Sequence, residues 1–171
     1  MLIERSLKSF FNLWDRIPEQ LAPRQLFVAG GNDNPAVREI LDRLHPQMQT
    51  EYLPRIAPTD ASRILSESSF VWLDYFHRPG VPADIVLKST AFAAACAHGA
   101  IPILPHRAST IAIDSDPLPG PFFIERAVSE LPDAAFRAEI AARFYHWYRR
   151  HAASNHLANQ VERALESSQG S

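Results

Sequence analysis

The sequence predicts an α/β domain built on a Rossmann-like parallel sheet flanked by helices. Three short apolar runs, at residues 25–29, 69–75 and 101–105, are continuous rather than alternating, as in strands buried on both faces. Segments with helical apolar spacing separate these runs. Because strands that alternate with helices form parallel sheets, we expect ligands to bind beyond the carboxyl ends of the strands.

The totals fit one globular domain. The chain has 171 residues and a formal net charge of -2, which argues against an electrostatic surface for nucleic acid. The single cysteine, Cys96, excludes an internal disulfide and favours a cytoplasmic location. Since no apolar stretch reaches about 18 residues, we expect no transmembrane segment. We expect a single domain over residues 1–165 and a disordered tail over 166–171.

In the first third of the chain, apolar spacing predicts a helix over residues 3–21 that Pro18 ends or kinks. The strand at 25–29 runs into the turn Gly30-Gly31. Asn34 as an N-cap and Pro35 at the first helical position then start a helix that continues to Leu44.

The rest of the chain repeats this alternation. We expect a weak strand around residues 51–53, a short helix capped by Thr59-Asp60, and a buried strand over 69–75. A helix from about residue 85 or 88 to His98, capped by Gly99, leads into the strand at 101–105. A small strand at 110–113 and long helical segments from residue 133 to 165, meeting near 154–155, complete the expected elements.

Residues 87–104 read LKSTAFAAACAHGAIPIL: a helix of small residues, then Gly99, then a strand containing Pro102. This stretch resembles the helix–glycine–strand segment in the C-terminal domain of the GT-B glycosyltransferases that use nucleotide sugars. The order of the upstream elements follows the same pattern, so the resemblance spans residues 20–165. It implies that the chain binds a nucleoside-diphosphate sugar, without a cofactor or bound metal, for transfer to an acceptor hydroxyl.

The chain departs from this family at two places. Many retaining members carry glutamates at the positions that here are Val86 and Ala94, so the sugar and ribose contacts of those carboxylates cannot be transferred to this chain. The family domain also opens with a strand before its first helix and joins an N-terminal acceptor domain. We therefore expect an N-terminally truncated or split product that does not catalyse transfer alone, and no catalytic residue is assigned.

Three groups are candidates for the diphosphate. Lys88, Ser89 and Thr90 begin a helix, where free N–H groups and the helix dipole favour anions; the alternative is a helix cap beside a solvated lysine. Gly30 and Gly31 let the backbone approach a ligand, although a purely structural turn is the favoured explanation of them. His77 and Arg78 follow the strand at 69–75, in a loop that could also be ordinary surface.

The resemblance places the nucleobase at residues 52–56, with Arg55 and Ile56 as the contacts; alternatively, Arg55 is an ordinary solvated residue. His98 suits the carboxyl end of a helix, and Cys96 suits packing. The remaining histidines of the terminal helix are spaced by five residues, which does not place them on one face. We therefore expect no metal site among His146, His151 and His156.

Two other readings of the chain stay open. The first is a non-catalytic interaction module of the same fold, which recruits a partner through the aromatic residues of its C-terminal helices at 144–148. The second is an unrelated α/β domain of the flavodoxin or receiver type. A receiver needs acidic residues at strand ends, and here only Asp74 qualifies.

Overall fold

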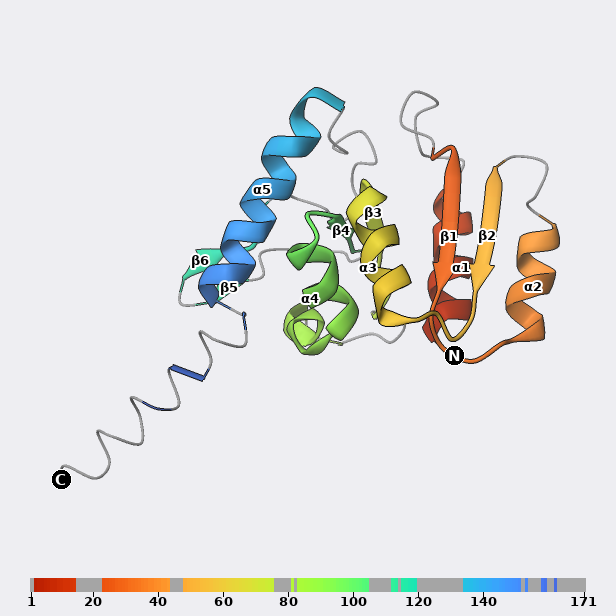
Figure 1. Ribbon diagram of the computed structural model, residues 1–171, viewed down its shortest axis with the longest axis horizontal. Coiled ribbons are helices and arrows are strands. Elements are labelled where there is room, and N and C mark those ends of the chain that lie inside the picture. The colour runs from red at the N-terminus through yellow and green to blue at the C-terminus, as the bar shows by residue number, and fades with distance from the viewer. Residues whose placement is uncertain are drawn as a thin grey trace.

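A computed structural model describes residues 2–14, 23–43, 48–75, 81, 83–104, 112–113, 115–119, 134–151, 153, 158–159 and 162. It consists of small parallel sheets flanked by helices, which confirms the predicted α/β class (Figure 1). The elements in chain order are α1 (Leu2–Trp14), β1 (Gln25–Ala29), α2 (Pro35–Asp42), β2 (Gln49–Leu53), α3 (Pro58–Glu67), β3 (Phe70–Trp72), the 3-10 helix η2 (Ala83–Lys88), α4 (Thr90–Ala97), β4 (Ile101–Ile103), β5 (Ala112–Ile113), β6 (Asp116–Pro117) and α5 (Ala134–His151).

The first strand pair joins β1 to β2 in parallel, in continuous register from Gln25 opposite Gln49 to Ala29 opposite Leu53. The crossover between them is α2, which starts as predicted: Pro35 takes the first helical position and the Asn34 side chain accepts a hydrogen bond from the Ala36 N–H at 3.1 Å. Val37 and Leu41 of α2 pack with Val28 of β1 and Leu7 of α1 in one buried cluster.

One face of this pair is buried and the other is only partly covered, so the prediction of strands buried on both faces is wrong here. Leu26, Val28 and Tyr52 pack into the cluster with α1 and α2. The opposite face alternates with them, and its residues are exposed or half-buried: Gln25, Phe27, Ala29, Gln49, Glu51 and Leu53. The composition explains the error, because glutamine and glutamate occupy places that a fully buried parallel strand would give to apolar residues.

The second strand pair joins β3 to β4 in parallel, with Phe70 opposite Ile101 and Trp72 opposite Ile103. All three residues of β4 are buried, as the continuous apolar run predicts. Phe92 and Cys96 of α4 pack against this pair on one side of the cluster, and Phe144 and Trp147 of α5 complete it. Figure 1 places this body to the left of the β1–β2 pair, with α3 between them.

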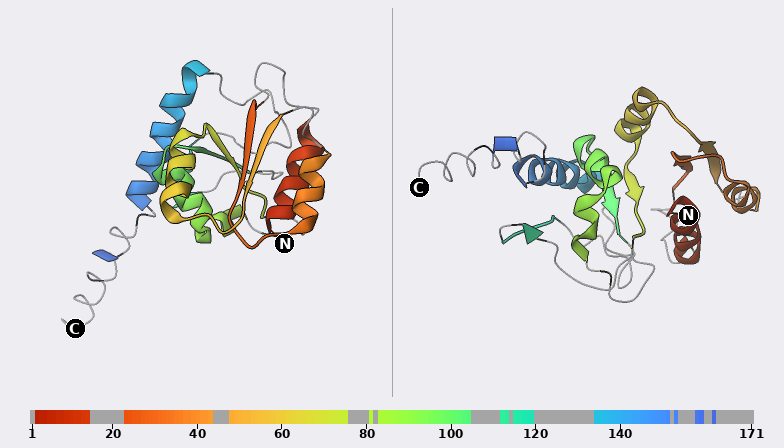
Figure 2. Two further views of the ribbon diagram at one scale, coloured as in Figure 1. Left: turned by 45° about the vertical axis from the view of Figure 1, so that its right-hand side comes forward. Right: turned by 90° about the horizontal axis from the view of Figure 1, so that it is seen from below.

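The two pairs do not join into the single predicted sheet. In the described residues, β1 bonds only to β2 and β3 only to β4. Instead α1 lies against the free edge of β3. The Asp74 N–H donates to Ser6 Oγ at 3.4 Å, and Arg5 donates to the Asp74 carbonyl oxygen at 2.9 Å. Seen from below in Figure 2 (right), α1 lies close to β3 and to the β1–β2 pair.

Contacts along α1 show that the two pairs run in the same direction. Near its start, the Ile3 side chain lies 3.1 Å from where a Cβ on Gly31 would sit, and Arg5 reaches Asp74; both partners directly follow strands. A turn later, the indole of Trp72 donates to Ser9 Oγ at 2.9 Å, and its ring meets the Phe10 ring edge-on at 5.2 Å. Therefore the carboxyl ends of β1 and β3 lie at the same end of the fold.

Several helix boundaries differ from the predicted ones. The cap of α3 is Ala57, with Pro58 at the first helical position, rather than Thr59-Asp60. The segment before α4 is the separate 3-10 helix η2, because Ser89 caps α4 and so starts the α-helix later. At the end of α4 the cap is His98, and Gly99 follows with a φ of 72°, the left-handed turn expected of a glycine there.

The hairpin β5–β6 is fastened to the end of α5 through Asp116. Its carboxylate oxygen Oδ2 accepts from Arg150 at 2.5 Å and lies 2.7 Å from His151 Nε2, while the indole of Trp147 donates to its backbone carbonyl at 3.1 Å. The contacts of the carboxylate with His151 and Arg150, of which the His151 hydrogen bond has the largest effect, lower the pKa of the Asp116 carboxyl. The sequence predicted a strand here but not the second strand, β6.

Some expectations fall outside the described residues: the continuation of α1 to residue 21, the loop at 76–80, and the tail at 166–171. Helix α5 accounts for the first of the expected terminal segments, to His151. Within the described part of the chain, every helix is too short or too polar to cross a bilayer.

Leu7→Ala is expected to destabilise the protein by about 2–5 kcal/mol, because this 4 % exposed side chain joins α1 to β1 and α2 and its removal leaves a cavity. Urea unfolding followed by tryptophan fluorescence measures the change. The control is Lys8→Ala, one residue further on, whose exposed ion pair with Glu4 contributes less than about 1 kcal/mol. Equal effects of the two variants would show that α1 does not carry the packing described here.

Asp116→Asn is expected to lower stability near neutral pH but not in acid. Because the folded-state pKa of Asp116 is lowered, its contribution is present above the ordinary carboxyl pKa of about 4 and is lost as the pH falls through the folded value. The measurement is the urea midpoint of both proteins between pH 7 and pH 3. A gap between them that stays constant over this range would contradict the assigned role of the carboxylate.

Candidate functional site

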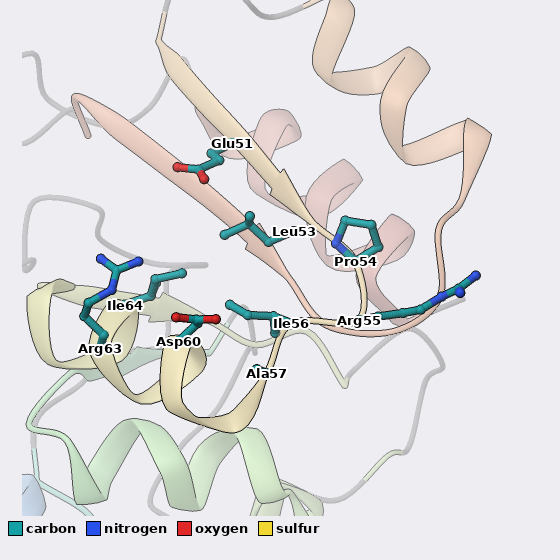
Figure 3. A pocket seen from close by; sticks show the side chains of 9 residues that line it. All are labelled: Glu51, Leu53, Pro54, Arg55, Ile56, Ala57, Asp60, Arg63 and Ile64. Carbon is teal, nitrogen blue, oxygen red and sulfur yellow. The ribbon is translucent and has the colours of Figure 1, made fainter.

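A hollow of about 420 Å³ opens at the carboxyl end of β2. It is lined by the end of the strand, the turn that follows and the start of α3: Glu51, Leu53, Pro54, Arg55, Ile56, Ala57, Asp60, Arg63 and Ile64. Figure 3 shows Leu53 from the strand and Ile64 from the helix pointing toward each other. The volume lies within the range of about 300–1,000 Å³ that small-molecule sites occupy.

The hollow combines an apolar wall with charged groups. Leu53, Ile56 and Ile64 supply the wall, while the carboxylates of Glu51 and Asp60 come from opposite sides (Figure 3). Arg63 also lines it, and its guanidinium lies 3.2 Å from the Glu67 carboxylate one turn later. An arrangement of this kind can hold a flat apolar group against the wall and accept hydrogen bonds from hydroxyl groups at the carboxylates.

The two residues predicted to contact the base are both at the hollow, but in different ways. Ile56 is half-buried in the lining. Arg55 is exposed, and Figure 3 shows its side chain pointing away from the other lining residues. Its backbone has a φ of 55°, in the left-handed region, and its N–H donates to the Gly31 carbonyl oxygen at 2.9 Å. Arg55 therefore determines the conformation of the turn, and it lines the hollow with its backbone rather than with its side chain.

The predicted glycine turn is hydrogen-bonded to two residues that line this hollow, Leu53 and Arg55. Gly30 and Gly31 have φ values of 94° and 67°, which residues with a side chain rarely adopt. The Gly30 N–H donates to the Leu53 carbonyl oxygen at 3.0 Å, and Gly31 accepts from Arg55. In the described residues, the N–H groups of Gly31, Asn32 and Asp33 have no acceptor, so the turn presents free donors beside the hollow.

The far side of the same turn is held by Tyr52. Its hydroxyl accepts from the Asn34 N–H at 3.0 Å and donates to the Asn32 carbonyl oxygen at 3.2 Å. The Arg38 guanidinium lies 5.2 Å from the Tyr52 ring centre and forms a two-bonded pair with Asp33, at 3.0 and 2.9 Å. This pair lowers the pKa of the Asp33 carboxyl. These contacts fix the conformation of the turn from two sides.

The second predicted group begins α4, after the carboxyl end of β3. Ser89 is its N-cap: the side-chain oxygen accepts from the Phe92 N–H at 3.1 Å and is also hydrogen-bonded to the Tyr75 hydroxyl. Lys88 and Thr90 on either side are exposed. Ser89 therefore has a structural role, while the lysine ammonium and the Thr90 hydroxyl are accessible to a ligand.

The first turn of α1 lies between these two groups. Ile3 approaches Gly31, and Arg5 reaches Asp74, next to the Tyr75 that bonds Ser89. Arg5 Nε is buried and has no hydrogen-bond partner in the described residues. Arg5, Glu51 and Asp60 were not among the predicted site residues, because they lie within α1, β2 and α3 and only the packing of these elements brings them to the site.

His77 and Arg78 lie outside the described residues, so the structure does not relate them to the other candidates. Cys96 is buried, as predicted, and its burial raises the pKa of the thiol to about 12, which makes it a poor nucleophile. In the part of the chain that is described, no group of three or more His, Cys, Asp or Glu side chains could share a metal ion.

His98 joins α4 to α3. Its ring Nδ1 lies 2.8 Å from the Ala94 carbonyl oxygen, and its Nε2 lies 2.6 Å from Ser62 Oγ. A carbonyl oxygen only accepts, so in the neutral ring Nδ1 carries the hydrogen and the Ser62 hydroxyl donates to Nε2. The histidine thus ties the helix that lines the hollow to the end of α4.

Comparisons of the chain with protein-family models, with curated proteins and with solved structures found no match. The assignment of a function therefore depends on the arrangement of these residues.

Ser89→Ala is expected to lower stability by about 1–2 kcal/mol, because it removes the cap of α4 and leaves the Tyr75 hydroxyl without this partner. Urea unfolding in the absence of ligand measures the loss. Thr90→Ala is the matched control, since its exposed side chain should contribute within about 0.5 kcal/mol. A Ser89 variant as stable as wild type would contradict the capping role.

Proposed function

We propose that the chain is a donor-nucleotide domain of the GT-B glycosyltransferase type, which binds a nucleoside-diphosphate sugar. The observation that carries this proposal is the hollow at the end of β2, which combines an apolar wall with two carboxylates and is bonded to the glycine turn. Binding beyond the carboxyl ends of parallel strands is the rule for α/β domains.

The hollow suits the nucleoside part of such a ligand. A base packs against Leu53, Ile56 and Ile64, and its edge reaches the backbone groups of residues 54–57. The ribose hydroxyls donate to Glu51 or Asp60, since ionised carboxylates only accept. Sugar recognition of this kind does not need the glutamates that the chain lacks at positions 86 and 94.

The diphosphate then lies over the strand ends, where several donors are directed. The N–H groups of Gly31, Asn32 and Asp33, which have no acceptor in the described part of the chain, are on one side, and Lys88 with the start of α4 is on the other. Arg5 lies between them, and its buried Nε has no acceptor among the described residues; a buried donor of this kind is a group that an anion would satisfy.

In a glycosyl transfer these donors would stabilise the negative charge that grows on the leaving diphosphate, by electrostatics rather than by a covalent intermediate. The acceptor hydroxyl would need a second domain to orient it. We therefore assign to this chain the binding of the donor and the stabilisation of the leaving group, and not the complete reaction.

A second candidate function is recruitment of a partner through α5. The aromatic residues of this helix are divided: Phe144 and Trp147 are buried in the core, whereas Phe136 and Tyr145 are 58 % and 38 % exposed. The exposed pair favours an interaction module. That reading predicts no nucleotide affinity, so the same experiment separates the two functions.

The test is thermal unfolding with UDP, GDP, ADP, CMP and dTDP. A ligand at about 100 times its dissociation constant stabilises by roughly 2.7 kcal/mol, which raises the midpoint by about 5–10 °C. One diphosphate should give this shift, and Lys88→Ala and Asp60→Asn should each reduce it, since they remove a phosphate and a ribose contact. Lys8→Ala, on the far part of α1, should keep it. No shift with any nucleotide would exclude the donor domain and leave the interaction module.

A further inference from the structure

The glycine turn contains two consecutive peptide groups whose carbonyl oxygens are both hydrogen-bonded. The Gly31 carbonyl oxygen accepts from the Arg55 N–H at 2.9 Å, and the Asn32 carbonyl oxygen accepts from the Tyr52 hydroxyl at 3.2 Å. In a planar trans peptide the carbonyl and the N–H point in opposite directions. The N–H groups of Asn32 and Asp33, which belong to these two peptides, therefore point away from the end of β2.

The Tyr52 hydroxyl bonds the peptide groups on both sides of Asp33. Besides donating to Asn32, it accepts from the Asn34 N–H at 3.0 Å. The ring that carries this hydroxyl packs against the buried cluster of α1, β1 and α2. Through these contacts, one side chain of β2 sets the orientation of the peptide groups before and after Asp33.

The turn also carries a negative charge that would oppose an anion. The Asp33 carboxylate belongs to the same residue as one of the N–H groups, and the Arg38 guanidinium donates to both of its oxygens, at 3.0 and 2.9 Å. Hydrogen bonding to Arg38 has the largest effect in lowering the pKa of this carboxyl, so it is ionised at neutral pH. Because the pair is neutral as a whole, Arg38 removes most of the repulsion that Asp33 would exert on a bound anion.

The same tyrosine also contacts this arginine. The Arg38 guanidinium lies 5.2 Å from the centre of the Tyr52 ring, within the range of a cation–π contact. Tyr52 therefore contacts the turn through its hydroxyl and the neutralising arginine through its ring. The two contacts can be separated experimentally, since phenylalanine keeps the ring and lacks the hydroxyl.

We propose that Tyr52 and Arg38 are positioning residues for a phosphate group bound at the turn. The Tyr52 hydroxyl orients the N–H groups that bind the phosphate, and Arg38 neutralises the carboxylate beside it. This inference rests on the proposed function, under which the phosphate belongs to the diphosphate of the donor. Successive main-chain N–H groups in a turn form a concave site for anions, which makes phosphate the chemical class of ligand.

The first test removes only the hydroxyl, in the variant Tyr52→Phe, and uses inorganic pyrophosphate as the probe. Pyrophosphate should shift the amide signals of Asn32 and Asp33 in NMR spectra of the wild-type protein. We expect its dissociation constant to rise about five- to tenfold in the variant, the equivalent of one lost hydrogen bond. Because the packed ring remains, the unfolding midpoint should fall by only about 2–6 °C.

Tyr145→Phe is the matched control, because it makes the same change at an exposed tyrosine of α5. It should leave the dissociation constant of pyrophosphate unchanged. An equal constant in Tyr52→Phe and wild type would overturn the positioning role of Tyr52. Amide signals of Asn32 and Asp33 that do not respond to pyrophosphate in the wild-type protein would overturn the whole inference.

The second test concerns the charge of Arg38. Arg38→Gln should raise the dissociation constant of pyrophosphate at least about threefold at low salt, and less at high salt, because the Asp33 carboxylate is then not neutralised. Adding Asp33→Asn to this variant should restore the affinity, a rescue that a loss of folding would not show. A double variant that binds no better than Arg38→Gln would overturn the neutralising role.

Arg43→Gln is the matched control for this charge. It removes an equal charge at the end of the same helix, from an ion pair with Glu39. Since this pair lies outside the turn, the variant should bind pyrophosphate more tightly than Arg38→Gln does. Equal losses in the two variants would show a general effect of net charge and would overturn the specific role of Arg38.

The same variants separate this inference from the proposed function. Pyrophosphate binding at the turn with the expected losses, in a protein that binds no nucleoside diphosphate, would exclude the donor function and support the positioning roles. A nucleoside diphosphate that binds equally to wild type and Tyr52→Phe would support the donor function and overturn the role of Tyr52.

Discussion

The structure depends on the position of α1. Leu7 on one side of this helix is buried against β1 and α2. On the other side, the side chains of Ser6 and Arg5 form hydrogen bonds with the backbone of Asp74, just after β3. No backbone bond joins the two strand pairs in the described residues, so these side-chain contacts, with the crossover α3, hold them together. They also bring the glycine turn and the start of α4 to the same end of the fold.

Local signals in the sequence were sufficient for most of the elements. Asn34-Pro35 and Gly99 act over one or two residues, and the structure uses each of them as expected at a helix end. The pairing of the strands was harder, because it depends on what covers each face. The polar residues Gln25, Gln49 and Glu51 already indicated an open face on β1 and β2, but the apolar neighbours of Gln25 dominated the prediction.

The candidate site was predictable where it follows strand ends and not where packing brings distant residues together. The glycine turn, Ile56 and the start of α4 all lie directly after strands or at a helix start. Arg5, Glu51 and Asp60 lie within elements, and only the approach of α1 and α3 makes them part of the site. Ser89 was predicted as a diphosphate contact or a helix cap, and the structure shows the cap, with its hydroxyl engaged by the Phe92 N–H and the Tyr75 hydroxyl.

The uncharged edge of β1 has a consequence for the behaviour of the protein in concentrated solution. In the described residues β1 pairs only with β2, and an unpaired row of backbone donors and acceptors on such a strand is a template for intermolecular β-pairing, the first step toward cross-β aggregates. Arg24, exposed at the start of this strand, is a charged gatekeeper of the type that limits such pairing. Self-association should therefore increase with ionic strength, which screens that charge.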